Sequence, residues 1–371
     1  MTGVQTCALP ILGDNKFAIY TNNEYTLNVG YYAYENSARL LVEPKGALPT
    51  RAEDNKTEKK TTAQITMLDT NGGLSILIRL EDGRFIVIDG GYSENFGDFS
   101  RAIKQQASAY TDEPIIAAWI ITHAHGDHVN LLFGQALAIK TSGITVESIL
   151  LNQLSEAETA RSYETTQAYQ AGKVSGFYDF GQSEGITKSN AVIEEIAPAF
   201  GADLYKVHIG QSFNISNVRM DVLFTMEGDA PEVCNSYNGI SNIIKMTFTD
   251  SETGDVTTFL STGDATGRGM DVARRIFGDY MKCDILSVNH HGWSTKGGDS
   301  QMISAFKSVS PALLLWPVGY VDINTVSNLT YNRVLFENSS FKECHYAGNG
   351  DGSHVLVPLP YVEGNVSRIK Y

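Results

Sequence analysis

The sequence predicts an α/β protein built as a sandwich of two similar halves. Three observations lead to this prediction. From residue 62 onward, short apolar runs rich in β-branched residues alternate with segments of helical spacing. The order strand, strand, helix, strand, helix in the first half returns in a similar form after residue 191. Polar, histidine-rich clusters stand directly after several apolar runs, where a rigid scaffold can present chemistry.

Length and composition are those of a globular protein with a sizeable core. The chain has 371 residues, of which 42% are hydrophobic, enough for one large domain or two. Its net charge of −14 disfavours a broad nucleic-acid-binding face, because such faces need clustered Lys and Arg. No apolar run reaches transmembrane length. The four cysteines show no CxxC spacing, so neither a thiolate zinc site nor a disulfide framework is indicated.

The N-terminal part of the chain differs from the rest. Residues 1–11, MTGVQTCALPI, resemble a translated sequencing-adapter remnant, so they are excluded from the fold prediction. We therefore expect the natural N-terminus to be missing, which leaves the cell compartment unknown. Residues 17–60 predict a short N-terminal β extension of two or three strands, followed by a polar, charged linker. The main domain is expected over residues 62–360.

The first half of the main domain is predicted from apolar runs separated by turn signals such as NGG and EDG. Its elements are strands over 63–70, 74–80 and 84–90, a helix over 93–110, a strand over 114–121, a helix over 129–139 and a strand over 144–152. Residues 153–190 are polar and contain scattered aromatics. They predict either a lid that shapes a substrate pocket or a surface insertion whose aromatics pack locally.

The second half returns to alternating strands and helices. Its elements are a helix over 191–200, strands over 204–210, 218–226, 242–250 and 256–264, a helix over 270–278, a strand over 284–288, a helix over 301–309, a strand over 312–319, a helix over 329–337 and a strand over 353–359. His208 lies within one of these strands, and we interpret it as structural.

The segment THAHGDH, residues 122–128, predicts a metal site. It follows the apolar run 114–121 and places three histidines and an aspartate within six positions, although the whole chain has only eight histidines. Imidazole and carboxylate are the ligands that zinc and similar divalent metals prefer. The alternating His123 and His125 aim two rings in one direction, while Asp127 and His128 can serve a second ion. The competing interpretation is three satisfied surface histidines beside an aspartate.

Three further clusters follow predicted strands. Asp264, in STGD, has two oxygens that could bridge two ions, or it could be an N-cap for the next helix. In NHHG, the adjacent His290 and His291 cannot point the same way from an extended segment. One should therefore bind metal and the other should hydrogen-bond to the substrate or leaving group. Asp89, before two glycines, is interpreted as an orienting residue behind the ligands.

The motifs IVIDGG, THAHGDH, STGD and NHHG, in this order, resemble the metallo-β-lactamase fold superfamily. The closer resemblance is to the branch that contains the hydrolase domain of the competence protein ComEC and the pneumococcal phosphorylcholine esterase. In that branch a segment N-x-x-S precedes a strand, and residues Asn238 to Ser241 match it. The tail is also similar, with Pro311, an apolar strand, a helix and a Gly-rich turn before the last strand.

This resemblance implies an αββα metallo-β-lactamase-type sandwich with a binuclear centre of divalent ions, Zn²⁺ first and Mn²⁺ as the alternative. The implied ligands are His123 and His125 for the first ion, Asp127, His128 and His291 for the second, and Asp264 as the bridge. The choice of His291 over His290 also comes from the resemblance. Where many members have a further histidine, this chain offers Asn238, which would leave the first ion more open. Trp293 replaces a common serine and would form an aromatic wall of the pocket.

The implied activity is metal-dependent hydrolysis of a phosphodiester-type substrate by an activated hydroxide. Asp127 would orient this nucleophile or accept its proton, and His290 would contact the substrate. The expected partner is a small-molecule or polymer-linked phosphoester, with nucleic acid disfavoured by the acidic charge. Two alternatives stay open: a carboxylic ester, lactone or thioester hydrolase of the same fold, and a non-catalytic metal- or ligand-binding module.

Overall fold

A computed structural model describes most of the chain: residues 16–32, 37–44, 58–152, 164, 167–168, 170–173, 188, 190–226, 236–294, 299–319, 321–348 and 351–371. Three predicted features fall wholly or mostly outside these residues. They are the segment 1–11, the linker after residue 44 and the lid within 153–190.

Two sheets pack face to face in the main part of the molecule. The first sheet has the order β10-β9-β7-β6-β5-β4-β18-β19, with β8 also paired to β7. Its strands are β4 (Gln64–Met67), β5 (Ser75–Arg79), β6 (Phe85–Asp89), β7 (Ile115–Ile120), β8 (Thr145–Val146), β9 (Ser148–Leu151), β10 (Asp203–Lys206), β18 (His354–Pro358) and β19 (Ser367–Ile369). The second sheet runs from β11 to β17 in sequence order. Its strands are β11 (Ser212–Ile215), β12 (Val218–Phe224), β13 (Ile243–Thr249), β14 (Val256–Ser261), β15 (Ile285–Ser287), β16 (Leu313–Trp316) and β17 (Glu343–Tyr346).

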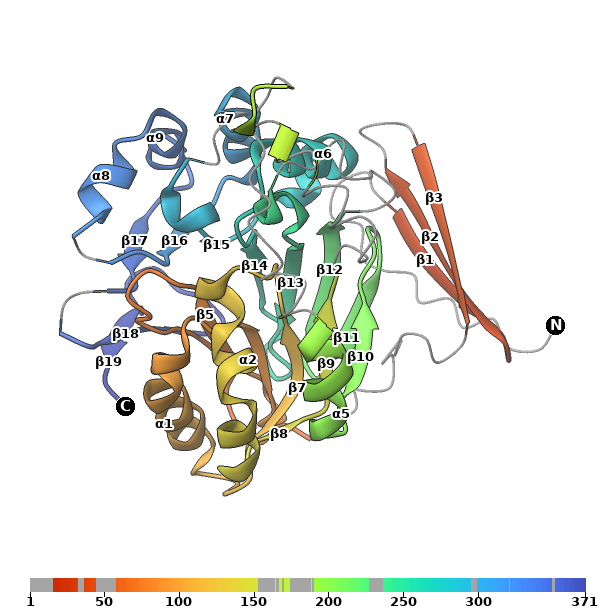
Figure 1. Cartoon of the computed structure of the whole chain (residues 1–371), viewed down its shortest axis with the longest axis vertical. Helices are drawn as coiled ribbons and strands as arrows, with labels where there is room; N and C mark the ends of the chain where they lie inside the picture. Colours follow the sequence, from red (N-terminus) through yellow and green to blue (C-terminus); the bar gives the residue numbers. More distant parts are fainter. Residues whose placement is uncertain are drawn as a thin grey trace.

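Helices cover the outer face of each sheet (Figure 1). The first sheet packs against α1 (Phe96–Ala107) and α2 (Gly126–Thr141), with the π-helical turn η4 (Val192–Ile196) and α5 (Ala197–Phe200) beside them. The second sheet packs against α6 (Gly267–Phe277), α7 (Asp299–Val309), α8 (Ile323–Ser327) and α9 (Thr330–Phe336). These four layers confirm the predicted αββα sandwich.

Three apolar clusters hold the layers together. Alternate side chains of one strand enter different clusters, because successive residues of a strand point to opposite faces. In β6, Ile86 and Ile88 join the core between the sheets, whereas Phe85 and Val87 pack under the helices. Strands buried on both faces read as continuous apolar runs, which is why the sequence revealed most of them.

The N-terminal β extension is a separate antiparallel sheet of β1 (Lys16–Thr21), β2 (Tyr25–Tyr32) and β3 (Ser37–Pro44). It appears in red beside the sandwich in Figure 1. Among the described residues, no helix combines the length and the hydropathy needed to cross a bilayer.

The elements differ from the prediction at several places, and one of them, α2, carries part of the site. Helix α2 begins at Gly126, inside THAHGDH, whereas we expected a helix only after His128. The strand β17, ECHY, was not predicted, because its side chains are only partly buried and form no apolar run. It pairs in parallel with β16 at the edge of the second sheet.

Candidate metal centre

The segment THAHGDH connects the buried strand β7 to α2. His125 occupies the N-cap position with extended backbone (φ −68°, ψ 152°), and Asp127 lies in the first turn of the helix. His123 and His128 are almost completely buried. Two elements therefore carry the motif: the loop after β7 carries His123 and His125, and α2 carries Asp127 and His128.

Four of the predicted ligands form one group: Asp127, His128, Asp264 and His291 have their ligand atoms within 4.8 Å of one another. The Nε2 atom of His128 lies 3.2 Å from Oδ2 of Asp264, and the Nε2 atom of His291 lies 3.2 Å from Oδ2 of Asp127. These residues come from α2, the loop after β14 and the loop after β15, so three separate elements converge here.

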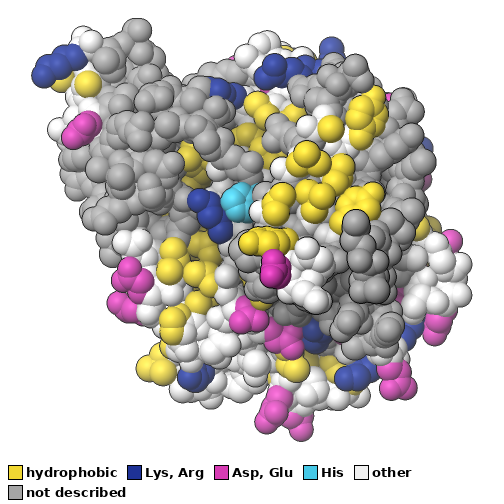
Figure 2. Space-filling view, turned by 90° about the vertical axis from the view of Figure 1, so that its right-hand side faces the viewer, with side chains coloured by type: hydrophobic (Ala, Val, Ile, Leu, Met, Phe, Trp, Pro, Cys, Tyr) yellow, Lys and Arg dark blue, Asp and Glu magenta, His cyan; other side chains and the backbone are white. Residues whose placement is uncertain are grey.

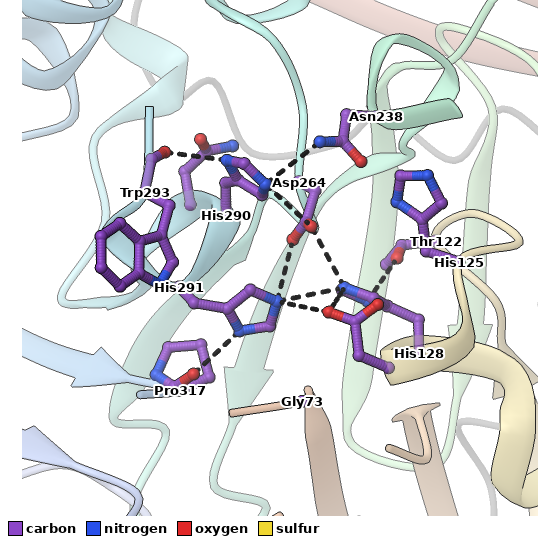
Figure 3. Close-up of polar contacts among 12 residues, drawn as sticks. Gly73, Thr122, His125, His128, Asn238, Asp264, His290, His291, Trp293 and Pro317 are labelled. Carbon is purple, nitrogen blue, oxygen red and sulfur yellow. Dashed lines mark hydrogen bonds and ion pairs between the residues drawn. The ribbon is translucent and has the colours of Figure 1, made fainter. Parts of the chain in front are cut away.

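A second group contains His123, His125 and Asp264, again with ligand atoms within 4.8 Å. The Nε2 atom of His123 lies 3.8 Å from Oδ2 of Asp264 and 2.9 Å from Nδ1 of His125. Asp264 is therefore common to both groups, as expected of a bridging ligand. In Figure 3 its carboxylate lies between His290, His291 and His128.

The donor set fits divalent cations. Asp264 is 2% exposed, and its Oδ1 atom is buried without a hydrogen-bond partner in the described part of the chain. A buried carboxylate oxygen left in this state costs free energy, which a bound cation would remove. Imidazole nitrogens and carboxylate oxygens are suitable ligands for Zn²⁺ or Mn²⁺.

The charges within the cluster keep the carboxylates ionised. Burial alone would raise the pKa of Asp264, but His128, His291 and His290 together hold it well below its usual value. Burial alone would lower the pKa of His128, but Asp264, Asp127 and Asp89 raise it well above its usual value. For His123, burial is the main cause of a pKa far below the usual range, so this ring is neutral, the form that binds metal.

Asp89 lies behind His128. Its Oδ2 accepts a hydrogen bond from Nδ1 of His128 at 2.7 Å, which leaves Nε2 facing the centre. Thr122 donates its backbone N–H to Oδ1 of Asp89 and its hydroxyl to Oδ2. Asp89 itself has φ +55°. Gly91, two residues later, is also left-handed, and a Cβ on Gly91 would clash with Thr70.

The NHHG segment (η7, Asn289–Gly292) is not extended, which corrects the premise of our prediction. His290 (φ 48°, ψ 43°) and His291 (φ 51°, ψ 14°) are both left-handed, and Gly292 follows with φ 85°. Both rings therefore approach Asp264: Nε2 of His290 lies 3.7 Å from Oδ2, and Nε2 of His291 lies 3.6 Å from Oδ1. Left-handed backbone costs about 1–2 kcal/mol per residue in L-amino acids, so other contacts must hold this turn.

Hydrogen bonds to carbonyl groups fix the orientation of both rings. Nδ1 of His291 lies 2.8 Å from the carbonyl oxygen of Pro317, and Nδ1 of His290 lies 2.8 Å from that of Trp293. With these nitrogens as donors, both Nε2 atoms are acceptors in the neutral rings. Nε2 of His290 accepts from Nδ2 of Asn238 at 3.2 Å.

Three of the remaining predicted residues, Asn238, Ser241 and Trp293, lie close to residues of the centre. Asn238 lies in the short helix η5 (Tyr237–Ile240), and its Oδ1 is buried without a hydrogen-bond partner among the described residues. Ser241 is fully buried, and its hydroxyl accepts the backbone N–H of Asp264, so it supports the loop rather than facing a pocket. Trp293 is 40% exposed beside His290. His208 lies after β10, outside both ligand groups.

Sequence reasoning missed Thr122 and Gly73. The Thr122 hydroxyl links Asp89 to the histidines, with Nδ1 of His123 only 3.1 Å away. A Cβ on Gly73 would lie 2.5 Å from the backbone oxygen of Asp127, so only glycine fits against the start of α2. The NGG sequence indicated only a turn, and nothing local in it points to this long-range contact.

The sandwich is that of the metallo-β-lactamase fold. Residues 68–158, which include THAHGDH, match the family model described as the Metallo-beta-lactamase superfamily. No curated protein matches the sequence.

Three solved structures are among those similar to the chain. The metallo-β-lactamase fold protein YhfI from Bacillus subtilis has 12% identity, with 80% of this chain and 100% of that chain covered and a TM-score of 0.42. Igni18, a metallo hydrolase from Ignicoccus hospitalis, has 14% identity, coverages of 80% and 98% and a TM-score of 0.38. A diphosphatase from the PhnP family has 12% identity, coverages of 68% and 85% and a TM-score of 0.34. Identities this low transfer no substrate to this chain.

Proposed function

We propose that this protein is a metal-dependent hydrolase that cleaves a phosphodiester-type substrate. The observation that carries the proposal is the shared carboxylate of Asp264, which belongs to both candidate ligand groups. His123, His125 and Asp264 would hold one ion, and Asp127, His128, His291 and Asp264 the other. When bound, two divalent ions lower the pKa of water and neutralise charge that develops on the scissile group.

Asp127 is suited to handle the proton of the attacking water. Its side chain is 26% exposed, whereas that of Asp264 is only 3% exposed, so Asp127 faces the open side of the cluster. Burial raises the pKa of Asp127, but His128 and His291 outweigh this and keep the carboxylate ionised. An ionised carboxylate at this position can orient a water molecule and accept its proton.

His290 is suited to contact the substrate. Its side chain is 20% exposed, and its Nε2 lies between the amide of Asn238 and the carboxylate of Asp264. When it carries a proton, Nε2 no longer accepts from Asn238 and would instead donate a hydrogen bond to an oxygen of the leaving group. The aromatic face of Trp293 would form a wall next to this position.

The phosphodiester class rests on the finer resemblance to the ComEC and phosphorylcholine esterase branch. The segment Asn238 to Ser241 supports it, since it precedes β13 and directs Asn238 toward His290. Nucleic acid is disfavoured as a substrate. On the face seen in Figure 2, the described Lys and Arg side chains are scattered and Asp and Glu side chains lie between them.

The test compares two substrates with one enzyme. Purified protein supplied with Zn²⁺ or Mn²⁺ is assayed with bis-p-nitrophenyl phosphate and with a p-nitrophenyl carboxylic ester. We expect cleavage of the phosphodiester and a loss on the order of 10³-fold in Asp264→Ala, because metal ions supply several kcal/mol of charge stabilisation. Asp279→Ala, an exposed aspartate with a 75% exposed side chain, is the matched control. Cleavage of the ester alone would overturn the phosphodiester assignment, and full activity without metal would overturn the metal centre.

A further inference from the structure

Helix α9 contacts the left-handed turn of the centre through two polar side chains. Asn332 donates Nδ2–H to the carbonyl oxygen of Gly292 at 2.8 Å, and the Tyr331 hydroxyl donates to the same oxygen at 2.9 Å. Asn332 is fully buried and Tyr331 is nearly so. Neither residue belongs to the ligand groups, and both stand some 40 positions after the turn they contact.

Asn332 also ties the turn to the preceding helix. Its Nδ2 group donates a second hydrogen bond to the carbonyl oxygen of Val326, in α8, at 2.8 Å. One amide group therefore links Gly292 to both α8 and α9. Buried amide donors are costly to leave unpaired, so this link constrains the position of the Gly292 carbonyl.

A second hydrogen bond holds the carbonyl group of His291, the residue before Gly292. Nε1 of Trp316 donates to the carbonyl oxygen of His291 at 2.8 Å, so two successive carbonyls of the turn are held by side chains. A Cβ on Gly292 would lie 2.6 Å from the Trp316 ring, which leaves no space for any other residue there. The turn is thus held from β16 on one side and from α9 on the other.

We propose that Asn332 is a positioning residue for the metal centre, acting through Gly292 and His291. The left-handed conformation brings His290 and His291 to the same carboxylate, and in an extended segment the two rings would diverge. Histidine does not favour this conformation, so the turn depends on the hydrogen bonds made to its carbonyls. This inference rests on the proposed function, because it assumes that His291 binds metal.

The experiment is a titration of the metal-free protein with Co²⁺, followed through the visible absorption of the bound ion. We expect Asn332→Leu to weaken Co²⁺ binding by about 10- to 100-fold, the usual effect of removing a residue that orients a ligand, and to change the spectrum. Tyr331→Phe removes one of the two donors and should give a smaller loss of affinity. It also provides the test if Asn332→Leu does not fold.

Val334→Ala is the matched control, because Val334 is buried on the same helix and belongs to the apolar cluster of α9. It should lower the thermal stability of the metal-free protein and leave Co²⁺ affinity unchanged. Wild-type affinity and spectrum in both Asn332→Leu and Tyr331→Phe would overturn the inference alone. An equal loss of affinity in Val334→Ala would also overturn it, since general destabilisation would then be the cause. Wild-type protein that binds no Co²⁺ would overturn the proposed function, and this inference with it.

Discussion

Asp89 accepts a hydrogen bond from Nδ1 of His128 at 2.7 Å, and both side chains are fully buried. The carboxylate holds Nδ1–H, so that in the neutral, metal-binding form of the ring the lone pair of Nε2 would face Asp264. Residues that orient a metal-binding histidine in this way affect affinity without touching the ion.

Replacement of Asp89 by Asn should weaken the binding of one ion. The amide keeps the size of the carboxylate but loses its charge and one acceptor, so His128 is no longer held in a single tautomer. We expect a loss of about 10- to 100-fold in Zn²⁺ affinity, measured by competition with a chromogenic chelator. Unchanged affinity in Asp89→Asn would show that Thr122 alone suffices to place His128.

The two adjacent histidines should respond differently to removal. His291→Ala is expected to lose one bound ion, because His291 belongs to the four-ligand group. His290→Ala should keep both ions and lower kcat by about 10²- to 10³-fold, the usual cost of removing a hydrogen-bond donor to developing charge. We would measure the metal content by mass spectrometry and kcat on the same samples, which distinguishes the role of His291 from that of His290. Loss of an ion in His290→Ala would reassign that residue as a ligand.

Metal removal should proceed in two stages. One ligand group has four residues and the other has three, and a zinc site with three protein ligands keeps an open position. We expect a mild chelator to release first the ion held by His123, His125 and Asp264, with loss of activity at that stage. His125→Ala should bind only the more tightly held ion. Release of both ions in a single step, in the wild type, would contradict this asymmetry.

A buried carboxylate away from the centre should make stability depend on pH. Asp221 is paired with Arg219 and accepts a hydrogen bond from Tyr280 at 2.6 Å. Burial would raise the pKa of Asp221, but Arg219 and the hydrogen bonds lower it below its usual 3.8. Because the folded-state pKa is lowered, the stabilisation is present above about pH 4 and is lost as the pH falls through the folded value.

Asp221→Asn should therefore unfold more easily at neutral pH, by about 3–5 kcal/mol, since it leaves the guanidinium of Arg219 without its partner. The difference in the free energy of unfolding between Asp221→Asn and the wild type should stay constant between about pH 7 and pH 5. It should become smaller below about pH 4. Urea unfolding in excess chelator measures the free energy of unfolding of each variant without a contribution from bound metal. Asp279→Asn, on the exposed surface, is the control and should show no such trend. A difference in the free energy of unfolding that becomes larger in acid would contradict the stabilising role assigned to the ionised Asp221.

Much of the fold and the candidate ligands could be predicted because both depend on short stretches of sequence. Strands such as β6 and β16 are buried on both faces and therefore read as apolar runs. Polar clusters at Asp89, His123 and Asp264 follow such runs directly, which placed them at strand ends.

The parts that the sequence did not reveal depend on contacts between distant segments. The left-handed turn at His290 is stabilised by α9 and β16, and neither contact leaves a local pattern in NHHG. The beginning of α2 at Gly126 was missed because the apolar periodicity of the helix begins only at Val129. Gly73 was read as a turn residue, although its lack of a side chain serves the contact with Asp127.

The start of α2 inside THAHGDH has a mechanical consequence. Asp127 and His128 both lie in the first turn of the helix, and the Asp127 carbonyl accepts a hydrogen bond from the Leu74 amide. His123 and His125 are attached instead to the end of β7. A small tilt of α2 would change the separation between the two halves of the centre while each half keeps its internal geometry. The spacing of the two proposed ions would therefore depend on how α2 packs on the first sheet.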